Sequence, residues 1–286
     1  MTAAILAPIK VNLALHVGPP RADGYHPVDT LCVFPEIGDI LSYGEGMEPG
    51  IDYAGPFGTE LADLPLSQNL VWRAFSILGI EPQGRFLLTK MVPVASGVGA
   101  GTADGAAAML LLNDVLGLGL SADALIRLSI GLGADGPVCM AGQVFGGGLW
   151  RARGIGERVE QVCRIAPQAI TIANPGLAVP TGGVFRMFDA QGPKGLRPVS
   201  AARGRSLVDH LRLNGNDLER PAFEMVPPVA SLVASLAAQP GAMAARMSGS
   251  GASCYALHAG PGSAERAARA LRSRGIWAEA CRLLPG

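Results

Sequence analysis

Residues 93–104 read PVASGVGAGTAD and lead directly into GAAAMLLLN at residues 105–113. The second segment is apolar nearly all round, which predicts a helix that is buried on every side. The glycines before it would place free backbone N–H groups at the positive end of that helix, and a phosphate could approach them closely. We therefore expect an anion-binding loop at the N-terminus of a buried helix.

Two common nucleotide-binding motifs do not fit this loop. The P-loop pattern GxxxxGK[ST] is absent from the chain. The dinucleotide fingerprint would require a glycine at the position of Thr102, and no acidic residue closes a following βαβ unit. Taken alone, the glycines are equally compatible with a structural turn, so the phosphate site depends on what accompanies the loop.

The composition of the 286 residues narrows the possible partners. The 23 Lys and Arg balance the 23 Asp and Glu, which argues against neutralising a nucleic acid backbone or an anionic membrane. Proline and glycine interrupt the long uncharged segments, so none provides the roughly 20 apolar residues of a membrane span. The start lacks a basic signal-peptide region, and the five scattered cysteines contain no CxxC pair. We expect a cytoplasmic protein with free thiols, a small-molecule substrate, and neither nucleic acid nor membrane as partner.

The first strand carries polar side chains at regular intervals. Residues 9–17 read IKVNLALHV, and their alternation predicts a half-buried strand. Period two would place Lys10, Asn12, Ala14 and His16 on one face, with Val11, Leu13, Leu15 and Val17 on the other. That polar face is either solvated or part of a site near the turn formed by residues 23–26.

Further along the chain, two loops and a change of pattern complete the organisation. Asp135 lies in a loop framed by glycine and proline, and a second loop of small residues occupies 247–253. The end of the chain reads strand, glycine turn, strand, helix and strand over 242–283, as in a split βαβ unit. We expect an α+β protein of two domains, 1–158 and 159–286.

Lys10, the glycine loop, Asp135 and the loop at 247–253, in this order, resemble the GHMP small-molecule kinases. The flanks are similar to the branch of that family that acts on 4-diphosphocytidyl-2-C-methyl-D-erythritol. The similar segments are APIKVNL at 7–13, RADGYH at 21–26, KMVPV at 90–94, GADGP at 133–137 and NDLE at 216–219. The resemblance implies an N-terminal mixed α/β ATP-binding domain and a C-terminal split βαβ (ferredoxin-like) domain.

The activity implied by the resemblance is ATP-dependent phosphorylation of the 2-hydroxyl of that cytidine-diphosphate alcohol, a step of the non-mevalonate isoprenoid precursor pathway. Asp135 matches the catalytic aspartate and would accept the proton of the attacking hydroxyl. Lys10 matches the catalytic lysine, which would keep Asp135 ionised and neutralise charge during transfer.

The resemblance also assigns the ATP loop and the metal. The implied loop residues are Pro93, Val94, Ala95, Ser96, Gly97, Val98, Gly99, Ala100, Gly101, Thr102 and Ala103. Thr102 is the candidate hydroxyl ligand of Mg²⁺. The family usually has two serines at the positions of Thr102 and Ala103, so one hydroxyl is missing here.

Four residues are implied to hold the substrate. Tyr25, His26 and Phe185 match positions that hold the cytosine, for which aromatic stacking is suited, and Asn12 is a candidate for polar contacts. Two alternatives stay open: another GHMP kinase, such as one acting on homoserine or mevalonate, and a non-catalytic nucleotide-binding relative, which Ala103 would suggest. The oligomeric state is not predicted.

Overall fold

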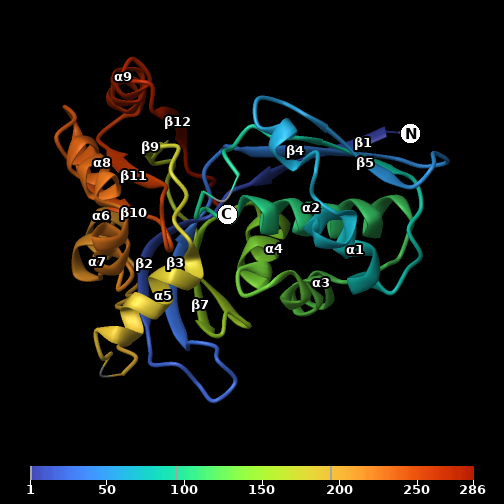
Figure 1. Ribbon diagram of the computed structural model, residues 1–286, viewed down its shortest axis with the longest axis horizontal. Coiled ribbons are helices and arrows are strands. Elements are labelled where there is room, and N and C mark those ends of the chain that lie inside the picture. The colour runs from blue at the N-terminus through green and yellow to red at the C-terminus, as the bar shows by residue number, and fades with distance from the viewer. Residues whose placement is uncertain (1, 95, 194) are drawn as a thin grey trace.

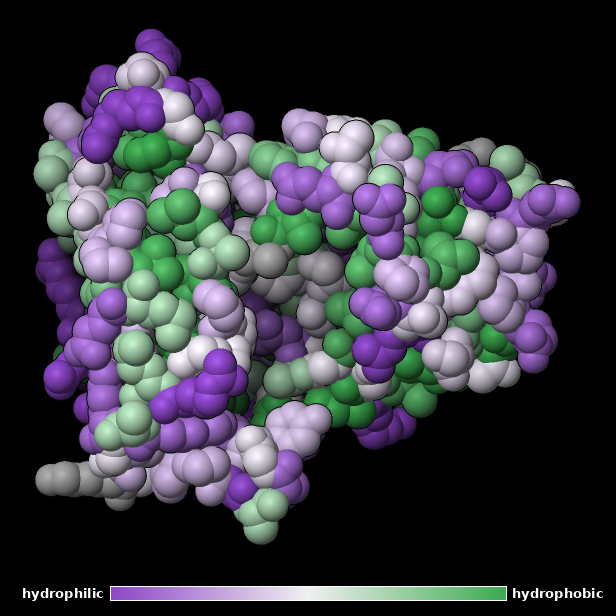
Figure 2. All heavy atoms as spheres, in the orientation of Figure 1, coloured by the Kyte–Doolittle hydropathy of each residue, from purple (hydrophilic) through white to green (hydrophobic). Residues whose placement is uncertain are grey.

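The computed structural model describes residues 2–94, 96–193 and 195–286, and arranges them in two halves with a hollow between them (Figures 1 and 2). The strands fall into three four-stranded sheets. Their bounds are β1 Thr2–Pro8, β2 Val11–Val17, β3 Val28–Val33, β4 Gly38–Gly44, β5 Gly50–Ala54, β6 Arg85–Thr89, β7 Leu149–Gly154, β8 Arg158–Cys163, β9 Ala169–Asn174, β10 Ala242–Met247, β11 Cys254–His258 and β12 Trp277–Arg282.

The α-helices are distributed over both halves of the molecule (Figure 1). Their bounds are α1 Leu70–Leu78, α2 Ala100–Val115, α3 Ala122–Leu128, α4 Gly136–Val144, α5 Thr181–Ala190, α6 Leu207–Leu213, α7 Glu219–Met225, α8 Pro227–Ala237 and α9 Pro261–Arg272. Short 3₁₀ turns at Gly58–Leu61, Leu66–Gln68 and Ser129–Leu132 complete the regular structure of the described residues.

The first sheet, in the order β1-β4-β6-β5, packs one face against α2. Helix α2 is buried nearly all round, as its sequence predicts, with Met109 and Leu112 packed among Leu41 and Phe86 from the sheet. The helix begins at Ala100, five residues before the predicted start, so the end of the glycine loop forms its first turn. The N–H groups predicted to bind an anion and the buried core therefore belong to one element.

The second sheet, β2-β3-β7-β8, carries a bulge that corrects the predicted faces of its first strand. The pairing of β2 with β3 shifts between Asn12 and Ala14, so that Leu15 takes the side of the sheet that Asn12 occupies. The prediction that Lys10, Asn12, Ala14 and His16 share one face is therefore wrong beyond Asn12. The solvated alternative also fails, because every residue of β2 is buried.

The third sheet has the order β10-β11-β9-β12, with all neighbours antiparallel. Numbered 1 to 4 along the chain, these strands have the order 2-3-1-4 across the sheet, which is the ferredoxin-like arrangement that a split βαβ unit produces. Helices α8 and α9 cover this sheet. The predicted ferredoxin-like C-terminal unit is confirmed.

Two features of the middle of the chain differ from the sequence analysis. Residues 136–144 form the buried helix α4, which begins inside the loop predicted around Asp135. Strand β8 begins at Arg158 and pairs with β7, so the predicted division into 1–158 and 159–286 falls at the first residue of a paired strand. That division stays a prediction. Across the described ranges, none of the helices combines the length and the apolar character needed to span a membrane.

Candidate functional site

The glycine loop and the second small-residue loop meet at the junction of the two halves. The amide N–H of Ser253 donates to the carbonyl oxygen of Ser96 at 3.0 Å. Gly97 has φ of +75°, and a Cβ there would lie 2.0 Å from the carbonyl oxygen of Gly251. Only glycine at position 97 allows this approach. The two loops lie about 150 residues apart in the chain and form one continuous backbone surface.

Lys10 lies directly beneath this surface and points at Asp135. Its Nζ is 3.2 Å from Asp135 Oδ2 and donates to Asn12 Oδ1 at 2.6 Å. The Lys10 side chain is 5% exposed, whereas that of Asp135 is 41% exposed. Burial lowers the pKa of Lys10, but the charge of Asp135 and two nearby thiols more than offset it, so the pKa lies above its usual value. Lys10 is a permanent cation, and the carboxylate it faces is open to a ligand.

Local structure explains why Asp135 is available. It is the N-cap residue of α4, yet its side chain makes no capping hydrogen bond and instead faces Lys10. The next residue, Gly136, packs so closely that a Cβ would lie 1.8 Å from the carbonyl oxygen of Ser129. Helix α4 is buried over Gly136–Gly142, so the backbone under the carboxylate is fixed by packing.

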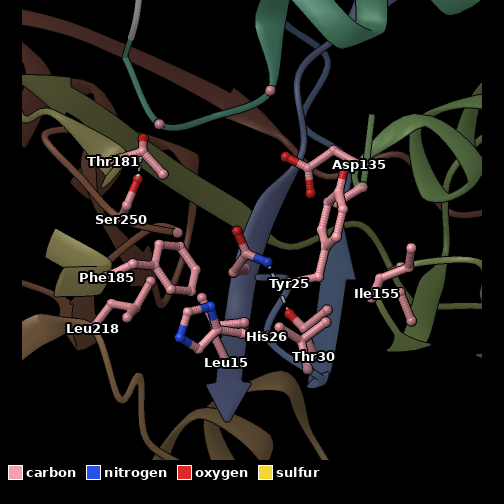
Figure 3. Close-up of a pocket in the computed structure, with 18 of the residues that line it drawn as sticks. Leu15, Tyr25, His26, Thr30, Asp135, Ile155, Thr181, Phe185, Leu218 and Ser250 are labelled. Carbon is pink, nitrogen blue, oxygen red and sulfur yellow. Dashed lines mark hydrogen bonds between the residues drawn. The ribbon is translucent and has the colours of Figure 1, made fainter. Parts of the chain in front are cut away.

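A first cavity of about 640 Å³ opens in front of this pair (Figure 3). Lys10, Asn12 and Asp135 line one side, and Thr181 with Ser250 closes another through a 2.9 Å contact between their hydroxyl oxygens. Asn12 is fixed by its Nδ2, which donates to Thr30 Oγ1 at 2.8 Å.

The three predicted cytosine-binding residues all line this first cavity. His26 and Phe185 lie together, with ring centroids 4.7 Å apart. Tyr25 is 56% exposed and lies across the opening from Phe185 in Figure 3. Phe185 is half-buried at the wall of the cavity, so it does not belong to the interior of the apolar core. The structure therefore brings two aromatic rings and an imidazole to the cavity that Lys10 and Asp135 also line, with Tyr25 on the side of Asp135 in Figure 3.

A second cavity of about 510 Å³ lies on the other side of the glycine loop. Both cavities are lined by Gly97, Gly99, Thr102 and Thr181, so the loop is their common wall. The amide N–H groups of Ala100, Gly101 and Thr102, in the first turn of α2, have no acceptor among the described residues. This end of the helix is suited to hold a phosphate chain between the two cavities.

The structure separates the residues of the predicted ATP loop into two groups. Four residues of the loop line the second cavity alone, namely Val94, Ser96, Ala100 and Gly101. Gly97, Gly99 and Thr102 line both cavities. Pro93 lines neither cavity, and the side chains of Val98 and Ala103 lie in the apolar core. Ala95 lies outside the described residues.

A buried charged cluster, which the sequence analysis missed, lies under the second cavity. Lys90 Nζ contacts Asp39 and lies 2.9 Å from Asp104 Oδ2. Asp39 Oδ1 also accepts the amide N–H groups of Met91 and Val92. The sequence signal was Asp104 itself, a carboxylate directly before the apolar run at residues 105–112 of the same helix. This cluster fixes the start of the chain segment that becomes the glycine loop.

The NDLE segment at 216–219 supports the second loop from behind. Asn216 Nδ2 donates to the carbonyl oxygens of Met247 at 3.1 Å and Gly249 at 2.8 Å. Glu219 Oε1 accepts the amide N–H of Met247 at 3.0 Å, and burial raises the pKa of this carboxyl. These contacts hold the small-residue loop against Asn12 and Lys10.

The described residues contain no group of three or more His, Cys, Asp or Glu side chains arranged to hold a metal ion. Near the glycine loop the available donors are oxygens, namely the Thr102 hydroxyl on the shared wall and the exposed Asp135 carboxylate. Such a sparse oxygen set suits Mg²⁺, which keeps several waters and takes its other ligands from substrate phosphates.

Comparisons with known proteins fit this geometry. The family models for the GHMP kinases N terminal domain and the GHMP kinases C terminal domain match residues 69–145 and 200–276. The 4-diphosphocytidyl-2-C-methyl-D-erythritol kinase of Granulibacter bethesdensis is 40% identical over 94% of this chain and 89% of its own. That of Cereibacter sphaeroides is 40% identical over 99% of each chain. The chain belongs to the 4-diphosphocytidyl-2-C-methyl-D-erythritol kinase family of GHMP kinases.

Solved structures agree with that assignment. The crystal structure of a 4-(cytidine 5'-diphospho)-2C-methyl-D-erythritol kinase superposes with a TM-score of 0.80 at 32% identity, over 99% of this chain and 100% of that one. Homoserine kinase from Cytophaga hutchinsonii shares the fold, with a TM-score of 0.70 over 99% of this chain and 95% of that one at 18% identity. The predicted family and two-domain α+β fold are confirmed, and this GHMP kinase is an ATP-dependent small-molecule phosphotransferase.

Proposed function

We propose that this GHMP kinase transfers the γ-phosphoryl group of ATP to the 2-hydroxyl of 4-diphosphocytidyl-2-C-methyl-D-erythritol, in the non-mevalonate route to isoprenoid precursors. The observation that carries the proposal is the Lys10–Asp135 pair, 3.2 Å apart, beside the shared wall of two cavities. The first cavity would hold the cytidine-diphosphate alcohol and the second would hold ATP. This arrangement supports direct transfer across the glycine loop.

In this mechanism Asp135 accepts the proton of the attacking hydroxyl as the oxygen bonds to the γ-phosphorus, while the bond from that phosphorus to the β,γ-bridging oxygen breaks and ADP leaves. Its carboxylate is open to the first cavity and faces the Lys10 ammonium at 3.2 Å. Lys10 also neutralises charge that spreads over the transferred phosphoryl oxygens. Because Asn12 accepts one hydrogen bond from Lys10, the ammonium is held at a fixed position and needs no reorganisation during the reaction.

The glycine loop and the start of α2 would bind the phosphates of ATP. Their free N–H groups supply donors at the positive end of the helix. Thr102 would hold Mg²⁺ through its hydroxyl, with the remaining ligands from phosphate oxygens and water. The metal would supply neutralisation of the phosphate charge. The Ala103 side chain lies in the apolar core, so it does not contribute a ligand.

The part of the first cavity between Tyr25 and Phe185 would hold the cytosine. Tyr25 and Phe185 provide ring faces for stacking, and His26 provides a hydrogen bond to the edge of the base. A cytoplasmic location fits the five free thiols, which a reducing compartment maintains. The balanced net charge fits a small-molecule partner rather than nucleic acid or a membrane surface.

A panel of alcohols tests the proposal. Purified protein is incubated with Mg-ATP and, separately, 4-diphosphocytidyl-2-C-methyl-D-erythritol, homoserine and mevalonate, and each product is weighed by mass spectrometry. We expect one phosphoryl group on the cytidine-containing alcohol alone. Transfer to homoserine or mevalonate, with none to the cytidine compound, would assign the chain a different substrate.

A further inference from the structure

The residue behind His26 is a carboxylate that the mechanism above does not use. Asp189, in the last turn of α5, places Oδ1 2.8 Å from Nε2 of His26. The two come from segments 163 residues apart, and the His26 side chain is only 11% exposed. This contact joins the turn after β2 to the helix that carries Phe185.

The position of Asp189 is unfavourable for the helix that carries it. The last turn of a helix is its negative end and favours cations, and α5 has no basic residue there. Among the described residues, the Asp189 carboxylate has no hydrogen-bond partner other than His26. A carboxylate that does not stabilise its own helix and meets a single imidazole is placed for that imidazole.

Hydrogen-bond chemistry then fixes the imidazole. An ionised carboxylate can only accept, so Nε2 of His26 carries the proton. In the neutral ring, Nδ1 is consequently the acceptor. Nδ1 makes no hydrogen bond within the described part of the chain, and it is not among the buried polar atoms that lack a partner. Because His26 lines the first cavity, this lone pair is available to a ligand there.

We propose that Asp189 is a positioning residue that makes the first cavity select cytosine over uracil. Cytosine carries an amino group at C4, which donates to an acceptor such as Nδ1 of His26. Uracil carries a carbonyl oxygen at the same position, which would face the Nδ1 lone pair. Asp189 itself lines the first cavity, and we assign its effect on the base to the tautomer of His26. The inference rests on the proposed function, because it assigns the cytidine group to this end of the cavity.

Binding of CDP and of UDP, measured by calorimetry, tests the proposal in the wild-type chain and in Asp189→Ala. We expect the wild type to prefer CDP. The variant should lose about tenfold in CDP affinity, which is the effect expected when one hydrogen bond is lost. The CDP-to-UDP ratio should fall toward one. With the full substrate, KM should rise about tenfold while kcat stays within about twofold, because the reacting groups are untouched.

Controls separate positioning from folding. Asp189→Glu should recover part of the CDP preference, and Asp189→Ala should add no further loss in a His26→Ala background. Glu224→Ala removes an exposed carboxylate of α7 that lines neither cavity and should bind CDP as the wild type does. An unchanged CDP-to-UDP ratio in Asp189→Ala would overturn this inference alone. A wild-type chain that binds neither nucleotide would overturn the proposed substrate, and this inference with it.

Discussion

Two buried lysines on either side of the glycine loop meet aspartates in contrasting ways. Lys10 is 5% exposed and faces Asp135, whose side chain is 41% exposed. Lys90 is 3% exposed and contacts two aspartates that are 0% and 3% exposed. The ammonium groups are alike, and the carboxylates differ. An open carboxylate can reach a substrate proton, whereas an enclosed one can only hold the structure together.

The pKa values of the buried groups in the Lys90 cluster reflect their burial and their charged neighbours. Burial lowers the pKa of Lys90, but Asp104 and Asp39 outweigh it and the pKa is raised, as for Lys10. Burial raises the pKa of the Asp104 carboxyl to about 7, against the opposing effect of Lys90. We therefore assign the Lys10 pair to chemistry and the Lys90 cluster to stability.

The largest expected effect is on turnover, at the open carboxylate. Asp135→Asn keeps the shape of the side chain but removes the proton acceptor, so kcat should fall by about 10²- to 10⁴-fold. Binding of ATP in the second cavity and the thermal midpoint should change little. Steady-state kinetics and calorimetry check both, and near-normal turnover in this variant would remove Asp135 from the mechanism.

The enclosed cluster should respond in the opposite way. Asp39→Ala leaves Lys90 partly uncompensated in the interior, which should lower the free energy of unfolding by about 3–5 kcal/mol. Denaturant titration measures this, with Asp52→Ala as the matched control, because Asp52 pairs with Arg85 at the exposed face of the same sheet. The folded fraction of Asp39→Ala should keep most of its single-turnover rate. A loss of turnover as large as that of Asp135→Asn would erase the contrast.

The contact between the glycine loop and the loop at 247–253 should affect both the Lys10 pair and the Lys90 cluster. In Gly97→Ala the added Cβ would meet the Gly251 carbonyl at 2.0 Å in a backbone of positive φ, so the loops must separate. A displacement near 1 Å at the site should lower kcat/KM about 10²-fold. Gly215→Ala, where no atom lies within 4 Å, serves as control. Equal activity of the two variants would show that the loops need not touch.

The pH dependence of stability should report on Asp104. Its pKa rises from 3.8 to about 7 on folding, so between these values the native state binds a proton that the unfolded state has lost. The free energy of unfolding should therefore decrease as pH rises from about 4 to 7, by at most about 1.4 kcal/mol per pH unit from this group. Asp104→Asn should flatten the curve. An identical slope in wild type and variant would contradict the assignment.

The smallest effect is expected behind the second loop. Asn216→Ala leaves the Met247 and Gly249 carbonyls without their donor, at about 1 kcal/mol for the lost hydrogen bonds. The KM for the cytidine-diphosphate alcohol should rise a few-fold with kcat nearly unchanged, because Gly249 lines the first cavity and the loop is loosened rather than removed. A fall in kcat without a change in KM would place Asn216 closer to the reacting atoms.

Much of this molecule could be predicted from its sequence because local patterns and global packing agree. The apolar run after the glycines is the buried helix α2, and the final strand–strand–helix–strand pattern is the ferredoxin-like sheet. The residues that the family resemblance implies also line one cavity, and their roles stay predictions that a resemblance and not periodicity supplied: Lys10, Asp135, Tyr25, His26 and Phe185.

What could not be predicted depended on contacts between distant segments. Helix α4 contains glycines and a proline with weak helix propensity, and burial against Phe34 stabilises it, since a Cβ at Gly142 would touch that ring. The bulge in β2 shifts Leu15 without a local signal. The partners of His26 and Lys90 come from far along the chain, so only the folded structure reveals Asp189 and Asp39.

The most direct test of the central claim is a double-mutant cycle on the single-turnover rate of phosphoryl transfer, measured by rapid quench. Lys10→Met, Asp135→Asn and the double variant are compared with the wild type at saturating Mg-ATP and cytidine-diphosphate alcohol. If the two groups act as one unit, the double variant should lose about as much rate as the slower single variant. Losses that simply multiply would show two independent residues and contradict the account.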